Sequence, residues 1–197
     1  ILHADHEQNC STTAMRGVGS SHVDPYSALA ASCAALYGPL HGGANEAVLA
    51  MLRDIGNVNN VPSFIKEVKE GKGEKKLMGF GHRVYKSGDS RVPTMKKYAQ
   101  VMADTIGEQK WMQMYNSLEK VMVEKKKIYP NLDFPAGPAY FMMGFEIDFF
   151  TPIFVMARTT GWSAHIMEQV ANNRIIRPLS EYIGAPQRKV IPISDRR

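Results

Sequence analysis

The apolar residues of this chain recur at helical rather than strand spacing. The stretch ANEAVLAMLRDIG, residues 44–56, shows this most clearly, because its apolar side chains form one broad face of a helix. These side chains are Ala47, Leu49, Met51, Leu52 and Ile55. Gly56 follows the last of them, and a glycine at that place commonly ends a helix. The pattern predicts an amphipathic helix that ends at Gly56.

Further stretches have the end signals and composition of helices. Asp24 followed by Pro25 is typical of a helix start, and the helix predicted there runs to the Gly38-Pro39 pair. Others are predicted over residues 61–71, 93–107, 111–127 and 151–173. Linkers rich in glycine, proline and charge separate them at residues 71–91, 129–138 and 174–184. Because strand signals are scarce, the sequence predicts an all-α fold.

Composition indicates a globular chain with a modest positive charge. It has 197 residues, 44% of them hydrophobic, and a formal net charge of +5. That charge fits nucleic acid or a polyanionic small molecule such as CoA or a nucleotide. No nucleic-acid-binding motif is present, so we place nucleic acid behind the small molecule. The apolar run FFTPIFVMA is broken by Thr151 and Pro152, and no membrane span is predicted. Cys10 and Cys33 lack metal-site spacing and are interpreted as reduced intracellular thiols.

The loop GFGHRVYKSGDSR, residues 79–91, carries candidate chemistry. Gly79 and Gly81 precede His82, and a residue without a Cβ lets backbone approach a ligand closely. Lys86 and Arg91 follow, and arginine binds carboxylates with a planar fork. The combination suits a small, oxygen-rich anion. A surface turn that holds a histidine is the more frequent case, and the loop alone does not decide between them.

Two other positions have both a chemical and a structural interpretation. His41, in GPLHGGANEA, precedes a predicted helix start, where the helix dipole disfavours the protonated ring. A neutral imidazole there can donate a hydrogen bond to a developing oxyanion, or His41 is simply exposed in a glycine turn. Asp133 lies in the apolar loop PNLDFPAG, where a carboxyl tends to have a raised pKa and to act as a base. Alternatively, Asp133 caps the helix that begins near Pro138 or binds the backbone amides of its own loop.

Arginine placement gives a further signal. Arg158 lies within the apolar stretch FVMARTTGW, where burial without a carboxylate partner is costly. An internal salt bridge is the common explanation. Arg91 and Arg177 follow loop motifs, whereas Arg174 and Arg188 are interpreted as surface charges.

The N-terminal stretch LHADHEQNCST resembles a metal site only superficially. Its histidines, His3 and His6, are three residues apart with Glu7 outside them, whereas a metalloprotease needs two histidines four apart with glutamate between them. We predict no metal here and interpret the stretch as a helix end with satisfied polar side chains.

Taken together, these segments resemble the citrate synthase family. DHEQN, GPLHGGANEAV, GFGHRVYKSGDSR, PNLDF, ARTTGW and RIIRP occur in the family's order along essentially the whole chain. The resemblance is to the C-terminal half of a family member, without the N-terminal helices of the large domain. It implies a citrate synthase-like multi-helix fold. Residues 1–56 would then belong to the large domain, residues 57–155 mostly to the small CoA-binding domain, and residues 156–197 to the C-terminal large-domain helix and tail. It also implies that this chain alone is poorly soluble or inactive unless the missing half is supplied.

The resemblance implies an acyltransferase of the tricarboxylic acid cycle that condenses acetyl-CoA with oxaloacetate and water to citrate and CoA, with no metal and no permanently bound cofactor. By family roles, Asp133 is the base, His41 stabilises the enol or enolate, and His82 polarises the keto carbonyl. The remaining family matches are the oxaloacetate ligands His6, His82, Arg91, Arg158 and Arg177, the CoA contacts Leu77, Met78, Gly79, Phe80, Gly81 and Lys86, and the supporting Asn9 and Asn131.

Departures and alternatives concern mainly the acyl donor. Ser90 replaces the family's usual proline, and Pro135 and Ala136 stand where many relatives have tyrosine and serine. A 2-methylcitrate synthase, which uses propionyl-CoA with the same acid, base and arginines, is the alternative activity, and a non-catalytic relative that kept the fold is the alternative from another class. The resemblance implies a homodimer in which Arg177 reaches the neighbouring site. It also implies location in the bacterial cytoplasm or the mitochondrial matrix.

Overall fold

The computed structural model describes residues 1–71 and 75–196. In that part of the chain the regular backbone is helical, and the one β-type contact is an isolated bridge between Phe80 and Pro130. The longer helices are α1 (Cys10–Gly19), α2 (Pro25–Leu36), α3 (Ala44–Ile55), α4 (Val61–Glu70), α5 (Val92–Ile106), α6 (Lys110–Lys126), α7 (Asp133–Met142) and α8 (Phe150–Ala171). Short 3-10 turns are η1 (Val58–Asn60), η2 (Ile147–Phe149) and η3 (Ile193–Asp195). The predicted all-α fold is confirmed.

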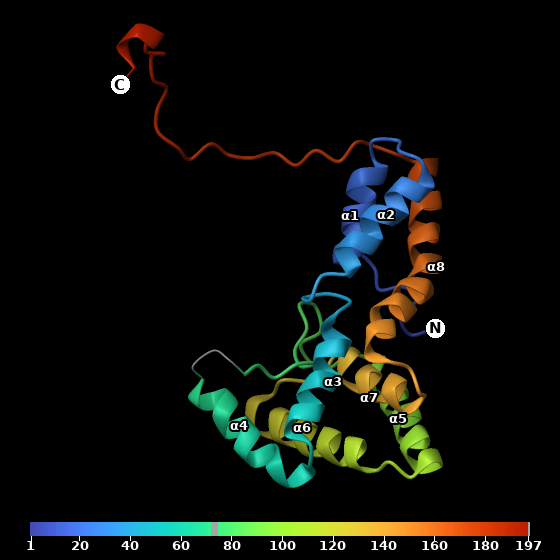
Figure 1. Cartoon of the computed structure of the whole chain (residues 1–197). Helices are drawn as coiled ribbons and strands as arrows, with labels where there is room; N and C mark the ends of the chain where they lie inside the picture. The colour runs from blue at the N-terminus through green and yellow to red at the C-terminus, as the bar shows by residue number, and fades with distance from the viewer. Residues whose placement is uncertain (72–74, 197) are drawn as a thin grey trace.

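The helices form two groups that share α8 (Figure 1). At one end α1 and α2 pack against each other and against α8, with Leu36, Phe154 and Trp162 buried between them. At the other end α3 to α7 enclose the larger core. In that core the rings of Tyr115 and Phe134 stack with centroids 4.3 Å apart. The start of α8 joins this core through Phe150.

Several helix ends follow the predicted signals. The carboxylate of Asp24 accepts hydrogen bonds from the amides of Tyr26 and Ser27, so it caps α2 as predicted. Gly56 ends α3 with a φ of 69° and donates its amide proton to Leu52 O. Both predictions are confirmed, because the capping chemistry is local to the sequence.

Two helices differ from the prediction. The linker predicted over residues 129–138 is helical from Asp133 onwards, so no helix starts near Pro138. Asn131 Oδ1 accepts the Asp133 amide and starts α7, and Pro135 stands in the first turn, where a missing amide proton costs no helical hydrogen bond. The helix α1 was not predicted, because CSTTAMRGVG is rich in threonine and glycine. Packing against α2 and α8 stabilises it.

Residues beyond α8 run away from the helical body as an exposed, extended segment (Figure 1). Its first residues are attached to the end of α1, since Asn173 donates to Ser20 O and the Ile176 amide donates to Ser20 Oγ. None of the described helices is long and apolar enough to cross a membrane. The predicted division of the chain at residues 56 and 155 stays a prediction.

Candidate active site

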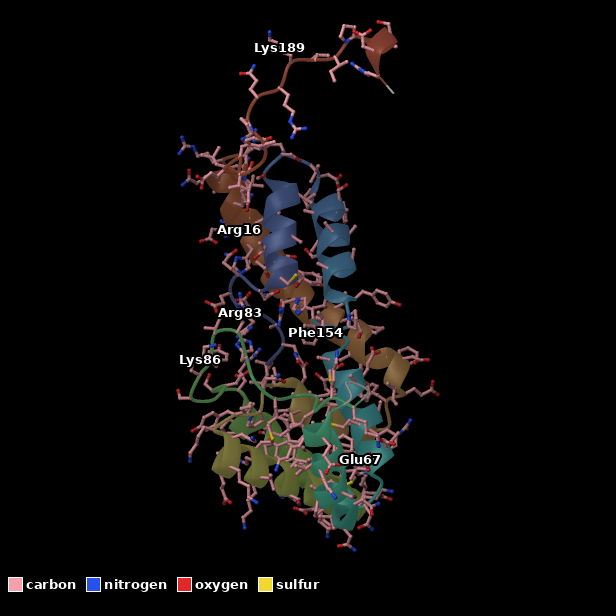
Figure 2. All side chains as sticks on the ribbon, turned by 90° about the vertical axis from the view of Figure 1, so that its left-hand side faces the viewer. Arg16, Glu67, Arg83, Lys86, Phe154 and Lys189 are labelled. Carbon is pink, nitrogen blue, oxygen red and sulfur yellow. The ribbon has the colours of Figure 1, made fainter. Side chains whose placement is uncertain are left out.

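One cavity of about 270 Å³ brings together residues from every motif of the resemblance except RIIRP. Figure 2 shows two of its lining residues, Phe154 and Arg83, at the level where the two groups of helices meet. Predicted site residues in the lining are His6, His41, Gly81, His82, Arg91, Asn131, Asp133 and Arg158. The segments that carry them are far apart in the sequence, so only the tertiary fold makes this site.

The histidine loop and the start of α7 are joined by backbone hydrogen bonds. The Gly81 amide donates to Tyr129 O at 2.8 Å, and the Asn131 amide donates to Gly79 O at 2.9 Å. The Asn131 side chain adds a bond to Gly81 O at 2.9 Å. Gly79 has a φ of 80°, and a Cβ there would lie 2.7 Å from Phe134 Cβ. The close approach that requires this glycine is therefore to α7 of the same chain.

His82 has a defined tautomer and a supported ring. Its Nδ1 accepts the amides of Val84 and Tyr85 at 3.1 and 3.2 Å, so the proton of the neutral ring is on Nε2. The Tyr85 ring stacks on it with centroids 4.6 Å apart. Burial lowers the pKa of His82; the Asp89 charge acts to raise it, and the Arg91 charge lowers it further. A neutral Nε2–H donor is thus available at the cavity wall.

His6 lies beside His82, with ring centroids 5.1 Å apart. Its Nε2 is 2.8 Å from the Tyr85 hydroxyl, which therefore supports both histidines. Burial first, and then the charge of Arg91, lower the pKa of His6 to about 4. His6 is therefore neutral at physiological pH.

His41 stands before α3 and also meets the first turn of α1. The Ser11 amide, a free donor of that turn, donates to His41 Nε2 at 3.3 Å. The neutral ring therefore carries its proton on Nδ1. Burial and then the Arg158 charge lower the pKa of His41 to about 4. The geometry supports a neutral His41 ring that can donate from Nδ1. Asn9 belongs to the same network, because its Oδ1 accepts the Ser11 hydroxyl at 2.7 Å.

Asp133 is half-buried at the first position of α7 and lines the cavity. Burial raises its pKa to about 7, against the lowering effects of Arg91 and Arg158. Its own amide, not its carboxylate, makes the hydrogen bond that starts the helix. The Asp133 carboxyl therefore does not cap the helix, and it is left to the cavity with a pKa suited to proton transfer near neutral pH.

Arg91 is held by a buried carboxylate. Its Nε and Nη2 donate to Asp89 Oδ1 and Oδ2 at 3.0 and 2.7 Å, a two-point pairing that fixes the plane of the guanidinium. Burial acts to raise the pKa of Asp89, but the hydrogen bonds and charge of Arg91 more than reverse it, so the pKa lies below its usual range. The Nη1 side of Arg91 remains directed to other partners, among them Leu2 O at 3.4 Å.

Arg158 is 1% exposed and lies in the middle of α8. Its Nε donates to His3 O, its guanidinium lies 4.7 Å from the centroid of the Phe154 ring, and its Nη1 has no hydrogen-bond partner in the described residues. Burial, and then Arg91, lower its pKa to about 10, so it remains charged at neutral pH. The internal salt bridge considered from the sequence is not formed within residues 1–71 and 75–196. A buried cation without a carboxylate partner is costly, and an anion in the cavity would offset that cost.

The N-terminal segment is attached along α8 and carries His3 and His6 into the site. Three contacts follow one another along this segment. Arg158 Nε donates to His3 O, the Gly161 amide donates to Ala4 O at 3.1 Å, and His165 Nε2 lies 3.0 Å from Asp5 Oδ1. A Cβ at Gly161 would lie 2.2 Å from Ala4 O. Gly161 is therefore required where this segment crosses the helix.

The residues assigned to CoA by resemblance lie outside the cavity, apart from Gly81. Met78 and Phe80 pack on the larger core, and Leu77 lines a separate apolar cavity of about 260 Å³ between α4 and α6. Lys86 is exposed and donates to Arg83 O at 2.8 Å (Figure 2). Arg177 is exposed just beyond the attached part of the C-terminal segment and does not line the cavity.

Several lining residues were not predicted as site residues: His3, Leu40, Ala44, Arg83, Leu132 and Phe154. Arg83 adjoins His82 in the same motif, and its charge was the available signal. His3 was set aside with the metal hypothesis, and Phe154 has the signature of a core residue. Their exposure to a cavity depends on packing that the local sequence does not record.

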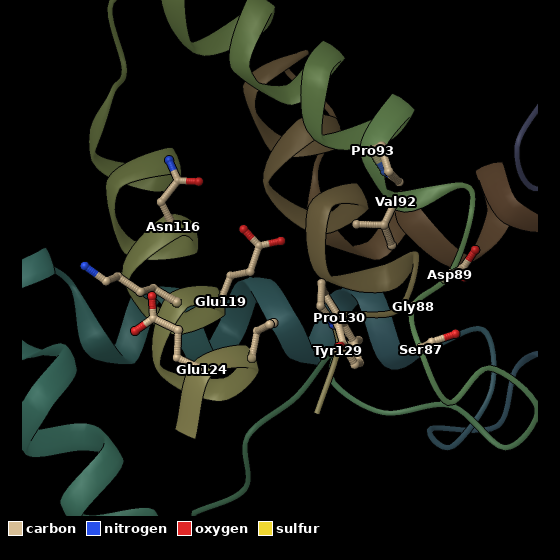
Figure 3. Close-up of a pocket in the computed structure, with 12 residues that line it drawn as sticks. Ser87, Gly88, Asp89, Val92, Pro93, Asn116, Glu119, Glu124, Tyr129 and Pro130 are labelled. Carbon is tan, nitrogen blue, oxygen red and sulfur yellow. The ribbon is translucent and has the colours of Figure 1, made fainter. Parts of the chain in front are cut away.

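A larger cavity of about 500 Å³ opens on the other side of residues 87–89, between the start of α5 and the side of α6 (Figure 3). Asp89, Glu119 and Glu124 line it with Lys120, and no histidine or arginine does. An anion would meet mainly carboxylates there, so it is not the candidate site. Within the described residues, no group of three or more His, Cys, Asp or Glu side chains is placed to hold a metal ion.

Comparison with known proteins gives the relatives of this chain. The family described as "Citrate synthase, C-terminal domain" matches residues 1–179. The chain is 52% identical over 196 residues to 2-methylcitrate synthase 1 of Corynebacterium glutamicum and 53% identical over 191 residues to citrate synthase of Mycolicibacterium smegmatis. These matches cover 100% and 97% of this chain but 51% and 50% of the relatives. The chain spans about half the length of the curated relatives it matches.

Solved structures agree in fold. Citrate synthase from Thermotoga maritima superposes with a TM-score of 0.85 at 39% identity, over 99% of this chain and 54% of that one. The ternary complex of carboxymethyl coenzyme A and oxaloacetate with citrate synthase from Thermoplasma acidophilum gives a TM-score of 0.88 at 39% identity, over 99% of this chain and 53% of that one. Since the family match, the fold and the order of the motifs agree over nearly the whole chain, the chain belongs to the citrate synthase family.

Proposed function

We propose that the protein carrying this chain condenses an acyl-CoA thioester with oxaloacetate, and that acetyl-CoA is the donor, so that the products are citrate and CoA. The observation that supports it most is Arg158, a buried guanidinium that lines the cavity with no carboxylate partner in the described residues. An oxaloacetate dianion supplies the missing negative charge to Arg158 and Arg91. The Thermoplasma relative was solved with oxaloacetate and carboxymethyl coenzyme A, which fits this pair of substrates.

The proposed roles follow from protonation and hydrogen bonding. His82 donates from Nε2 to the keto oxygen of oxaloacetate and makes its carbonyl carbon more electrophilic. Asp133 removes a proton from the carbon next to the thioester carbonyl, and His41 donates from Nδ1 to the oxygen that becomes an enolate. The enolate carbon then bonds to the keto carbon, and water hydrolyses the thioester to release CoA.

For CoA, the apolar cavity beside Leu77 is the proposed adenine site. It is lined mainly by aliphatic side chains and bordered by Lys69, Lys125 and Lys126. A flat, apolar ring fits such a slot, and lysines near it suit phosphates. Gly79 and Gly81 then contribute backbone along the path from this cavity to His82, and Lys86 is proposed to meet a CoA phosphate.

The whole protein is proposed to be a homodimer in which Arg177 reaches the site of the partner subunit. Arg177 is exposed and is not part of its own cavity lining, and it lies near the start of a segment that leaves the helical body. A residue in that position is free to meet a neighbouring subunit. The division into a large domain and a CoA-binding domain at residues 56 and 155 belongs to the same proposal.

A second activity, 2-methylcitrate synthesis from propionyl-CoA, is favoured by the relative of that name at 52% identity. The two are separated by measuring CoA thiol release by the intact protein from acetyl-CoA and from propionyl-CoA, with and without oxaloacetate. Release that depends on oxaloacetate and prefers acetyl-CoA supports citrate synthesis, and a propionyl preference supports the second activity. Oxaloacetate binding without release from either donor would leave only a non-catalytic relative of the family.

A further inference from the structure

His3 is a buried histidine whose ring has no hydrogen-bond partner among the residues that the structure describes. It is 2% exposed, and within the described chain neither Nδ1 nor Nε2 has a partner. The Phe154 ring lies 4.1 Å away and the Tyr140 ring 6.0 Å away, measured between centroids, so aromatic carbon surrounds it on these sides. A buried donor left without a partner is costly. The ring therefore calls for a partner from outside the described residues.

The cavity is where such a partner would lie. His3 is part of its lining, together with Arg91 and Arg158. Arg158 Nη1 is likewise buried without a partner in the described residues, and Arg158 Nε is bound to the carbonyl oxygen of His3 itself. His3 and Arg158, each with an unpaired nitrogen among the described residues, line the same cavity of about 270 Å³. Because Arg158 is bound directly to the His3 backbone, a carboxylate held by Arg158 in this cavity would lie near His3.

The charge state of His3 suits hydrogen bonding rather than ion pairing. Burial, and then the charges of Arg158 and Arg91, lower its pKa to about 3, so the ring is neutral at physiological pH. A neutral imidazole has one N–H donor and one acceptor nitrogen. It can therefore bind an anion's oxygen without adding charge between the two arginines, where a third cation would be repelled.

We propose that His3 is a further substrate-binding residue, whose neutral ring donates a hydrogen bond to a carboxylate oxygen of the keto dicarboxylate held by Arg91 and Arg158. This inference rests on the proposed function, because it names a contact to the same substrate. It differs from a role in packing, for which only the shape of the ring matters.

The test separates hydrogen bonding from packing by direct binding of oxaloacetate to the intact protein, measured by calorimetry. His3→Phe keeps an aromatic ring against Phe154 and removes both nitrogens, and His3→Gln restores a donor. We expect the Kd for oxaloacetate to rise about tenfold or more in His3→Phe and to recover in part in His3→Gln. In turnover, KM for oxaloacetate rises while kcat changes less. Tyr115→Phe is the control, because it removes a hydroxyl from a buried ring outside the cavity and leaves binding unchanged.

The outcomes distinguish this inference from the proposed function. A folded His3→Phe variant that binds oxaloacetate with the wild-type Kd would overturn it and leave water as the partner of the ring. If the wild type binds no oxaloacetate, the proposed function is wrong, and the His3 contact, which depends on it, is wrong as well. Should His3→Phe not fold, nitrogen NMR of the wild-type histidine rings decides the matter. Oxaloacetate must shift the His3 ring resonances, and unchanged resonances at saturation would contradict the contact.

Discussion

The carboxyl of Asp133 allows a stability experiment that does not depend on turnover. Asp133→Asn keeps the shape of the side chain but removes its ionisation. Burial raises the pKa from the ordinary value of 3.8 to about 7, a difference of about three units at about 1.36 kcal/mol each. The folded state therefore holds this proton more tightly than the unfolded chain. Stability contributed by the protonated carboxyl is present below pH 3.8 and is lost as pH rises through about 7.

The full loss in the wild type amounts to about 4 kcal/mol above the folded pKa. Access of water through the cavity reduces it, and we expect about 2–4 kcal/mol. The variant escapes this loss. It should therefore become more stable relative to the wild type as pH rises from about 3.8 to about 7. Urea unfolding of the intact protein at several pH values measures the difference.

Asp89→Asn is the matched control with the opposite sign. The pKa of Asp89 lies below its usual range because of Arg91, so its ionised form is the stabilising one. Its replacement should cost stability at neutral pH, and the cost should shrink as pH falls through the folded pKa. A stability difference between wild type and Asp133→Asn that stays constant over the pH range would refute the claim that this carboxyl is buried with a raised pKa.

The same ionisation predicts how turnover depends on pH. Asp133 acts as a base only when deprotonated, so kcat/KM should rise as pH rises through about 7. Asp133→Asn should abolish turnover while oxaloacetate binding survives, because the arginines are untouched. A pH profile without this rise, measured for CoA thiol release, would assign the limiting proton transfer to another group.

Two further changes test how the site is held. Asp89→Asn should raise KM for oxaloacetate about tenfold, because Arg91 loses the two-point pairing that fixes its plane; an unchanged KM would show that Arg91 is positioned by other contacts. Gly161→Ala should lower the free energy of unfolding by about 2 kcal/mol, because the new Cβ would meet Ala4 O. Gly17→Ala, which meets nothing within 4 Å, should be neutral or stabilising in the same thermal unfolding measurement, and equal melting temperatures for both would refute the packing account.

The chemistry of individual residues was only partly readable from the sequence. His41, His82 and Asp133 were recognised as candidates, but each kept a structural alternative until its partners were known. Asp133 shows why: its proximity to Phe134 and Pro135 suggested a raised pKa, whereas the bond from its amide to Asn131 Oδ1 came from the fold. Protonation depends on burial and on charges from other segments, and neither is local.

The segment assigned to CoA shows a different limit. The glycines around His82 were explained by close approach of a ligand, and at Gly79 the close approach is to Phe134 and Val48 instead. A glycine in the sequence indicates a position where the backbone can adopt a positive φ. Which surface comes near it is decided only when distant segments pack.

The sequence by itself determined the helical class, the end signals at Asp24 and Gly56 and the order of the family's motifs, because capping and periodicity act over a few residues. Tertiary structure alone decided that α1 forms, that α7 begins at Asp133 and that Arg158 is buried without an ion pair in the described residues. It also brought His3 into the cavity beside Arg158. The physical reason is that burial, tautomer and charge state are set by neighbours that lie far away along the chain.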